Sequence, residues 1–514
     1  MGDAAAAARE PTRVSSFLKR RATLAMLFGI IALGVWPRLS HIGRPLFLDL
    51  HAWRQADSAA FIHGYLIDSF NPFSPSIDRH PCHAKQRAFG RVEAELPVVP
   101  FLAAAPLRLL GLTHASAPYV RSVSIVVFIF GCFALFACMR ELGAAAADAL
   151  LAVAAFSAAP LAIFFTRSPQ PDGQSLSVAF AAIWALARYL NHAPHSSARV
   201  RAVDLGLVFS FSALLLLMKI SNAYLGIVMG YLVLTRRRPR ALLPEGPLLL
   251  AAGLACGAAA LWYVHAHAFG WSFGVWSNSP RDKKFAELVQ FADPGVWRKL
   301  LERLSWDILT AAGCVLAAIG LAARSRVAYV RVAAVWFVSS TLFIGVTLNA
   351  QLRHVYYQLC WIPPAALAQA AGARFLWSRG AYGRSALALL VAAHCAITWS
   401  VLWGRAPNAS VEGASYFTED SRLREPIEAL RKYLPENAMF VTEDRDPRLY
   451  WNSGHRGYFS DSGKLSDIRS CMDGTTNYLL VGARLRAHLK GKESFNQAFE
   501  EIWSSQAFGL YRLP

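Results

Sequence analysis

Ionisable and aromatic side chains gather in one short segment, FLDLHAWRQAD at residues 47–57, which directly follows the first long apolar run. The segment holds two carboxylates, Asp49 and Asp57, and between them His51, Trp53 and Arg54. Charged groups at a membrane boundary are costly, so they tend to be there for chemistry or for recognition. A carboxylate can take a proton from a hydroxyl group, and an arginine can bind a phosphate. The segment therefore predicts a site that activates an acceptor and holds a phosphate group.

Membrane helices must position this segment. The chain has 514 residues, of which 55% are hydrophobic and only 17% are charged, and its apolar runs are close to the roughly 20 residues that cross a bilayer. The runs are apolar on all sides, which excludes a soluble helical bundle with one polar face. We predict an α-helical multi-pass membrane protein with about eleven spans, near residues 22–38, 117–138, 145–166, 173–190, 203–219, 222–234, 246–264, 305–323, 328–347, 355–373 and 385–403.

Basic residues predict the orientation, because short cytoplasmic loops are rich in Lys and Arg. The N-terminal segment and the run RRRPR at 236–240 are basic, which places the N-terminus in the cytoplasm. No convincing cleavage site follows the first apolar run, so we expect an uncleaved span. These loops also account for the net charge of +19 without a nucleic-acid partner. We predict a bacterial inner-membrane protein in contact with the lipid bilayer.

Three regions are predicted to lie outside the membrane on the non-cytoplasmic side. The first outer loop, at 41–116, should contain helices near 52–70 and 96–110 that could lie in the interface plane. A second outer loop, near 269–303, contains an amphipathic pattern at 291–301. The tail at 405–514 predicts a small periplasmic α/β domain, with a helix at 423–434 and strands at 438–441 and 478–481. The predicted division is thus a cytoplasmic segment 1–21, a transmembrane domain 22–404 and this tail domain.

Two cysteines fall on the outer side in this topology, Cys82 and Cys471, so a disulfide between them is one alternative. His80, Cys82 and His83 lack a second ligand pair at a recognised spacing, and no metal site is predicted.

The same topology brings polar residues of several loops to the outer face. Carboxylates, arginines and lysines at one depth fit the chemistry inferred from the first segment. Beside Asp49, His51, Trp53, Arg54 and Asp57, the candidates are Glu93, Glu95, Arg167, Asp172, Lys219, Arg353 and His354.

Each candidate also has a structural explanation. Asp49, Asp57 and Asp172 could begin helices, where Asp is favoured. Trp53 could anchor the chain in the membrane interface, and Lys219 could extend its ammonium group towards water.

The order of these motifs resembles the GT-C superfamily of integral-membrane glycosyltransferases. An apolar span is followed by the acidic loop motif, by EAELP at 93–97 leading into a helix, and by Arg121 at the start of the second span. The motifs PD at 171–172 and RHVYY at 353–357 come later. The likeness is greatest to aminoarabinose transferases and protein O-mannosyltransferases, especially to relatives with an H-x-W-R-Q-x-D loop, and covers about residues 20–400.

The resemblance implies a polyprenyl-phosphate sugar as donor, and a lipid, glycan or protein as acceptor, on the periplasmic face. It implies that a first-loop aspartate is the general base, and both Asp49 and Asp57 are candidates. Two motifs of the family are absent. Leu50 follows Asp49 where the family has an Asp-Glu pair, and Glu95-Leu-Pro97 occupies the position of the family's Lys-Pro-Pro motif. The phosphate-binding role therefore shifts to Arg54, Arg167, Lys219 and Arg353.

The predicted function is glycosyl transfer by direct, inverting displacement, which needs one carboxylate near the acceptor hydroxyl and positive charge on the departing phosphate. No cofactor is predicted, and a divalent metal stays open as an addition. A transporter or flippase of lipid-linked sugars is one alternative, but it should place ionisable groups within the spans and show internal repeats. A non-catalytic scaffold with a binding tail is the other alternative, and it would not need the two carboxylates.

Overall fold

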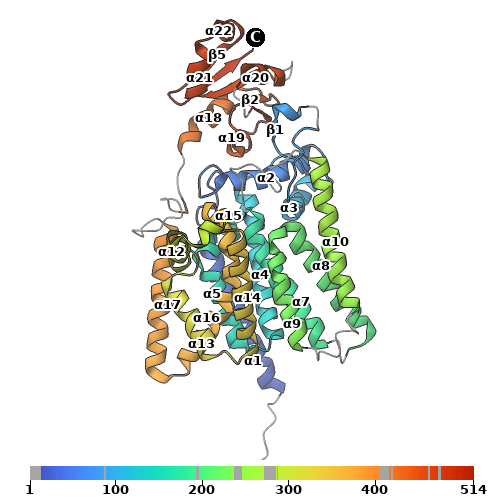
Figure 1. Ribbon diagram of the computed structural model, residues 1–514, viewed down its shortest axis with the longest axis vertical. Coiled ribbons are helices and arrows are strands. Elements are labelled where there is room, and N and C mark those ends of the chain that lie inside the picture. Colours follow the sequence, from blue (N-terminus) through green and yellow to red (C-terminus); the bar gives the residue numbers. More distant parts are fainter. Residues whose placement is uncertain are drawn as a thin grey trace, which may run out of the picture.

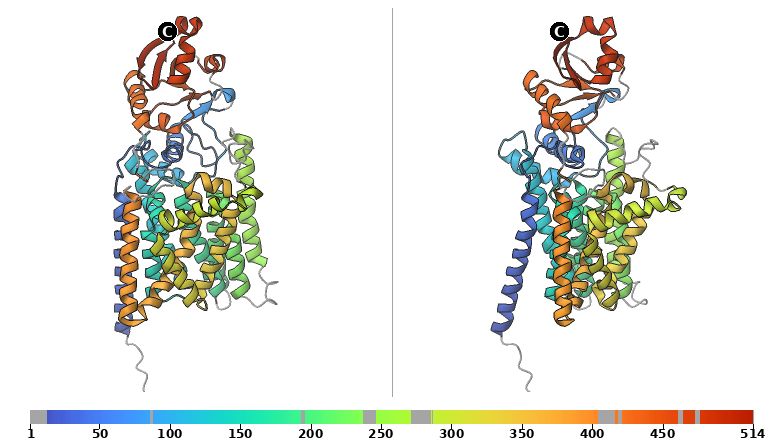
Figure 2. Two further views of the ribbon diagram at one scale, coloured as in Figure 1. Left: turned by 60° about the vertical axis from the view of Figure 1, so that its left-hand side comes forward. Right: turned by 90° about the vertical axis from the view of Figure 1, so that its left-hand side faces the viewer.

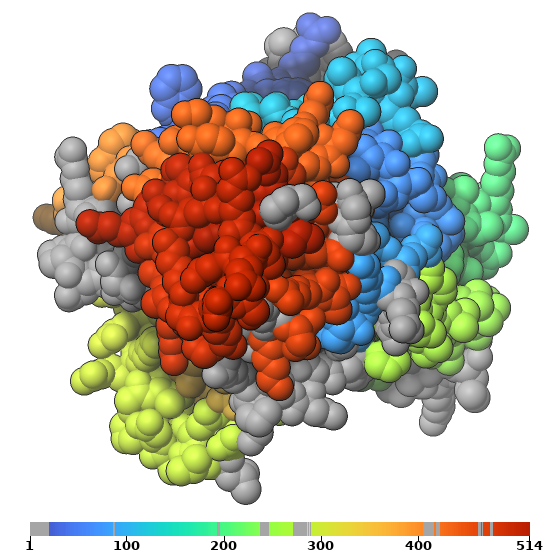
Figure 3. Space-filling model, turned by 90° about the horizontal axis from the view of Figure 1, so that it is seen from above, coloured from blue at the N-terminus to red at the C-terminus, as the bar shows by residue number. Residues whose placement is uncertain are grey.

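The computed structural model describes residues 13–85, 88–192, 196–236, 246–270, 285, 287–403, 416–417, 421–460, 464–472 and 476–513. Its helices form a bundle, and a sheet with flanking helices stands on one end of that bundle (Figure 1). We call this end the sheet end. The sheet and its helices cover the middle of the sheet end (Figure 3). The predicted basic run at 237–240 lies outside the described residues.

Long apolar helices make up the bundle. Six described helices are long and apolar enough to cross a membrane, and two bent pairs raise the number to eight. The six are α1 (Arg13–Leu39), α4 (Ala117–Glu141), α8 (Ala198–Met218), α10 (Gly246–Phe269), α14 (Ala328–Val346) and α17 (Gly380–Leu402). The bent pairs are α5 (Ala146–Ala158) with α6 (Pro160–Arg167), and α12 (Pro294–Arg303) continued by η5 (Leu304–Ile308) with α13 (Ala311–Ala323).

The predicted count of about eleven spans exceeds this number. The other three segments are also helical, as α7 (Pro171–His192), α9 (Leu225–Arg236) and α16 (Ile362–Trp377). At 1.5 Å per residue, α9 is about 18 Å long and α16 about 24 Å, both less than a hydrocarbon core of about 30 Å. The short helix η6 (Val355–Trp361) directly precedes α16, so the helical segment there is longer than α16 alone. Helix α7 is long enough, but it buries polar side chains such as Gln174, Ser175 and Ser177 inside the bundle.

Two helices of the first outer loop lie between the bundle and the sheet, as α2 (Ala52–Ile67) and α3 (Val98–Leu109) (Figures 1 and 2). Small and aromatic residues recur at helical spacing along α2, and most of its side chains are buried. Ala60 and Tyr65 pack in one cluster with Val120 of α4 and Trp451 of α19 (Pro447–Ser453). Helix α2 is therefore held from both sides, by the bundle and by the tail.

The tail folds onto a mixed sheet of six strands in the order β1-β3-β2-β4-β6-β5. Side chains that alternate along the strands fill a core on each face, one with Phe440 and Leu480 and the other with Val441 and Leu479. The bounds of the tail strands are β2 (Phe440–Thr442), β3 (Gly457–Phe459), β4 (Tyr478–Gly482), β5 (Glu500–Ser504) and β6 (Phe508–Arg512). The flanking helices are α18 (Arg424–Tyr433), α19, α20 (Leu465–Cys471), α21 (Ala483–Lys490) and α22 (Glu493–Ala498).

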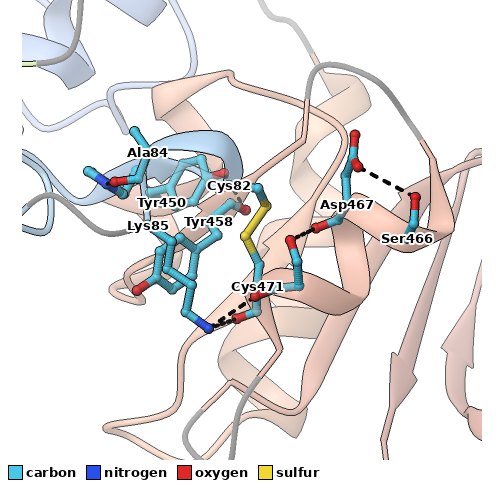
Figure 4. Close-up of a disulfide and its surroundings, with 10 residues drawn as sticks. Cys82, Ala84, Lys85, Tyr450, Tyr458, Ser466, Asp467 and Cys471 are labelled. Carbon is cyan, nitrogen blue, oxygen red and sulfur yellow. Dashed lines mark hydrogen bonds between the residues drawn. A yellow bond between two sulfur atoms is a disulfide. The ribbon is translucent and has the colours of Figure 1, made fainter.

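The first outer loop contributes the edge strand of this sheet, β1 (Arg79–Pro81), which runs parallel to β3. Directly after it, Cys82 in η1 (Cys82–Ala84) forms a disulfide with Cys471 of α20, with 5.5 Å between the two Cα atoms (Figure 4). Lys85 donates hydrogen bonds from Nζ to the carbonyls of Ser470 and Cys471. The disulfide that the sequence left open is thus formed, and the tail sheet is completed by the first outer loop.

Candidate active site

The turn that leads into α2 has an unusual backbone. Asp49 has φ 100° and His51 has φ 52°, a region that side-chain-bearing residues rarely adopt. Such conformations persist where the surrounding structure holds them in place. The turn therefore needs strong local contacts.

A cage of three arginines supplies these contacts around Asp49. Its Oδ2 accepts hydrogen bonds from Arg121 Nη2 at 3.0 Å and Arg167 Nη2 at 2.8 Å. Arg44 Nη1 lies 3.9 Å from Oδ1. The side chains of Asp49, Arg121 and Arg167 are all fully buried. We call Arg44, Arg121 and Arg167 the arginine cage.

The cage also binds the backbone of the preceding loop. Arg121 Nη1 donates to the carbonyls of Ile42, at 2.9 Å, and Arg44, and Arg167 Nη1 donates to the carbonyl of Ser40. The two guanidinium groups, from α4 and α6, thus tie the loop before α2 to the bundle. Asp49 and Arg167, which the sequence predicted for the site, meet each other here.

Two further ion pairs lie at the sheet end of the bundle. Arg54 Nη2 of α2 lies 3.1 Å from Glu95 Oε2, in the segment before α3. Lys219 Nζ, directly after α8, pairs with Asp172 Oδ1 in the first turn of α7. These four residues, Arg54, Glu95, Asp172 and Lys219, are the paired-charge site.

The two pairs influence each other. Burial raises the pKa of Glu95, but the charges of Arg54 and Lys219 lower it more, so the pKa lies below its usual value. Glu95 is therefore ionised and a weak base while both cations are beside it. Asp172 Oδ2 has no hydrogen-bond partner among the described residues.

Aromatic rings stand beside the paired-charge site. The Lys219 ammonium lies 4.6 Å from the ring centre of Tyr357 and 5.5 Å from that of Tyr356. His354 stacks on Tyr356 with ring centres 5.1 Å apart, and the ring of His51 lies 5.1 Å from that of Tyr356. Burial, followed by the charges of His354 and Arg303, lowers the pKa of His51 to about 3, so its ring is neutral at pH 7.

Trp53 extends this group, because its ring centre lies 6.0 Å from that of His354. A small pocket lies beside Arg54 and Glu95. Its lining includes Arg54, Ser58, Glu95, Pro97, Pro171, Gln174 and Met218. The pocket has a volume of about 30 Å³, enough for about one water molecule, and Arg54 and Glu95 are the members of the paired-charge site that line it.

Three predicted residues lie elsewhere. Asp57 Oδ1 is 2.5 Å from Arg79 Nη1 of β1, and both side chains are buried beneath the tail. Glu93 Oε2 is 3.3 Å from His267 Nδ1 of α10. Arg353 is exposed at the end of α15 (Leu348–Arg353). The catalytic roles of Asp49 and Asp57 stay predictions.

Several neighbours of these groups were not predicted from the sequence as site residues, among them Arg44, Arg79, Arg121, Tyr356 and Tyr357. The two tyrosines follow Arg353 and His354 directly in the motif RHVYY, which was the available signal. Arg79 had no such signal, because its three-residue strand is recognisable only through its pairing with β3. Among the described residues, no group of three or more His, Cys, Asp or Glu side chains could hold a metal ion.

No protein-family model matches the sequence. No curated protein matches it either. Similarity appears at the level of solved structures. ArnT from Cupriavidus metallidurans bound to undecaprenyl phosphate matches with a TM-score of 0.60 at 11% identity, over 94% of this chain and 97% of that chain. Its apo form matches with a TM-score of 0.61 at 12% identity, over 95% and 98% of the two chains.

A second kind of enzyme shares the architecture. The oligosaccharyltransferase of Archaeoglobus fulgidus, tethered to an acceptor peptide, matches with a TM-score of 0.55 at 10% identity, over 97% of this chain and 75% of that chain. ArnT is an aminoarabinose transferase, and both proteins are GT-C membrane glycosyltransferases. The chain described here therefore has the multi-pass fold of the GT-C membrane glycosyltransferases, with a mixed sheet at its C-terminal end.

Proposed function

We propose that this protein is an inverting membrane glycosyltransferase that moves a sugar from a polyprenyl-phosphate carrier to a lipid, glycan or protein on the periplasmic side. One observation carries the proposal: two cations and two carboxylates meet at the sheet end of a GT-C fold. The bundle end with the sheet is, in this proposal, the periplasmic end.

The cations Arg54 and Lys219 suit the phosphate of the donor. In a glycosyl transfer the phosphate leaves with negative charge, and positive groups placed beside it lower the barrier. Here each cation is already neutralised by a carboxylate. A bound phosphate would compete with Glu95 and Asp172 for the two cations, and a carboxylate that loses its cation becomes a better base.

Asp172 is the base that we propose. Its Oδ1 accepts from Lys219, whereas its Oδ2 has no hydrogen-bond partner among the described residues. The acceptor oxygen attacks the anomeric carbon, the bond from that carbon to the phosphate oxygen breaks, and the acceptor proton passes to Asp172. In this proposal the sugar contacts the neighbouring aromatic rings, those of His51, Trp53, His354, Tyr356 and Tyr357.

Asp49 and Asp57 have a different role in this proposal. Each already has an arginine partner, Asp49 in the arginine cage and Asp57 through Arg79. We propose a structural role for both residues. Asp49 attaches the loop before α2 to the bundle, and Asp57 attaches α2 to β1 of the tail sheet. Together they hold Arg54 of α2 in place.

Binding of undecaprenyl phosphate tests the donor assignment. We expect native mass spectrometry of the purified full-length protein to show a bound lipid phosphate, and Arg54→Gln and Lys219→Met to weaken binding by tenfold or more. Arg512→Gln, which removes an exposed ion pair with Glu500 in the tail sheet, is the control and should bind like the wild type. Equal binding by all four proteins would overturn the assignment.

A further inference from the structure

Helices α11 (Leu288–Phe291) and α12 form an arm that leaves the bundle sideways. The axis of α12 with η5 is bent by 98° from that of α13, the helix that follows. Since α13 runs within the bundle, α12 runs across the bundle direction. Figure 2 shows this arm, in yellow-green, projecting from the bundle near the sheet end.

The arm exposes large apolar side chains. Val289 is 71% exposed, Phe291 43% and Leu301 63%. A groove of about 760 Å³ lies against the arm, a volume within the range of ligand-binding pockets. Its lining is mainly apolar: Phe291, Ala292, Pro294, Trp297, Arg298, Leu301, Glu302, Leu304, Ser305 and Cys314. Contiguous exposed apolar surface of this kind marks a contact with another molecule or with a membrane.

The position of the arm indicates what covers it. Viewed from the sheet end, the arm lies outside the area that the tail covers (Figure 3). The neighbouring helices expose apolar side chains of their own, such as Val315 of α13 and Val346 of α14, which form the lipid-facing surface of the spans. The apolar side chains of the arm continue this surface at its edge.

The composition of α12 fits the boundary between lipid and water. Trp297 lies in the groove, and tryptophan is enriched at membrane interfaces. Arg298 and Glu302 form an exposed pair on the same helix, with 3.5 Å between Nε and Oε1. A helix with one apolar face and one charged face lies in the plane of the interface.

We propose that the α11–α12 arm docks in the lipid leaflet at the sheet end of the bundle, and that phospholipids cover the groove, with acyl chains on Phe291, Trp297 and Leu301 and headgroups at Arg298 and Glu302. The arm would then be a membrane anchor parallel to the surface, in addition to the spans. The proposal does not depend on the glycosyltransferase assignment.

The arm is also connected to the candidate active site. Arg303, at the end of α12, donates from Nη1 to the carbonyl of Gln351 at 2.6 Å and from Nη2 to the carbonyl of Leu352 at 3.1 Å. These residues precede Arg353 and His354 in the chain, and His354 touches the ring of His51. A docked arm therefore holds the loop that carries His354.

Photocrosslinking in a bilayer tests the docking. The full-length protein, with p-benzoylphenylalanine in place of Leu301, is reconstituted in vesicles of phosphatidylethanolamine and phosphatidylglycerol. After illumination, mass spectrometry should find at least tenfold more phospholipid adduct than when the same group replaces Tyr433, an exposed residue of α18 in the tail. Equal adduct at the two positions, or adducts only to a second copy of this chain, would overturn the proposal.

A second measurement guards against a local artefact of the label. With p-benzoylphenylalanine at Phe291, the added substitutions Val289→Asp and Leu301→Asp should lower the lipid adduct about tenfold, because they place charges on the docking face. Unchanged adduct would contradict the proposal. Undecaprenyl phosphate binding is measured on the same samples, so that a failure of docking is distinguishable from a failure of the donor assignment.

Discussion

The Lys219→Met substitution tests the paired-charge site most sharply, because it affects stability and binding in separable ways. Lys219 and Asp172 are paired with side chains only 8% and 2% exposed. Removal of the ammonium group leaves a buried carboxylate without its partner, which costs about 3–5 kcal/mol in comparable buried pairs. Replacing both members, in Lys219→Met/Asp172→Leu, removes both charges, and most of the lost stability should return.

The two variants should behave differently in two assays. Thermal unfolding of the detergent-solubilised protein should show a clear drop in Tm for Lys219→Met and a recovery for the double variant. Sugar transfer should fall by about 10²–10³-fold in Lys219→Met, a loss typical when one preorganised charge-stabilising group is removed from a site. It should fall further in the double variant, which also lacks the proposed base Asp172. Equal Tm values for the two variants would refute the buried pairing, and restored transfer in the double variant would refute the phosphate-binding role.

Three further predictions concern the frame around the site. Asp49→Asn leaves the buried arginines of the cage without a carboxylate, so we expect a loss of about 3–5 kcal/mol, seen as a lower Tm; an unchanged Tm would contradict the cage. Cys82→Ser should speed limited trypsin cleavage after Lys85, because the first outer loop is no longer bound covalently to the tail, and equal rates would argue against this coupling. Burial lowers the pKa of His63, but the Asp78 carboxylate at 2.5 Å raises it above the usual value, so stability from this pair is complete below about pH 6.5 and is lost as pH rises through the higher folded-state pKa. His63→Gln should flatten Tm between pH 6 and 9, and an unaltered pH profile would exclude this pair as its source.

The membrane helices could be predicted from the sequence because their physical cause is local. An apolar run near the thickness of a bilayer is visible in the composition alone. The bends are less visible: α5 and α6 meet at 72° within one apolar run, and this bend brings Arg167 to the cage. The three predicted spans beyond these eight are α7 and α16, which bury most of their side chains within the protein, and α9, which is only 12 residues long.

The partners of the charged residues could not be predicted, because they come from distant parts of the chain. Asp57 is paired with Arg79, which reaches it only because the first outer loop joins the tail sheet. Arg54 is paired with Glu95, which lies 41 residues further along the chain. The sequence predicts the types of the charged residues and their approximate depth in the membrane. It does not predict which of them form ion pairs, because this depends on how separate loops meet at the sheet end of the bundle.

The composition of surface glycans reports most directly on sugar transfer by this protein. Cells of the source organism with and without this protein are compared by mass spectrometry of their envelope lipids and glycans, and the deletion is complemented with the wild type or with Asp172→Asn. We expect one glycan product to lose a single sugar in the deletion, to regain it with the wild type and to stay incomplete with Asp172→Asn. Identical glycans in all strains would contradict a glycosyltransferase function, and full complementation by Asp172→Asn would exclude Asp172 as the base.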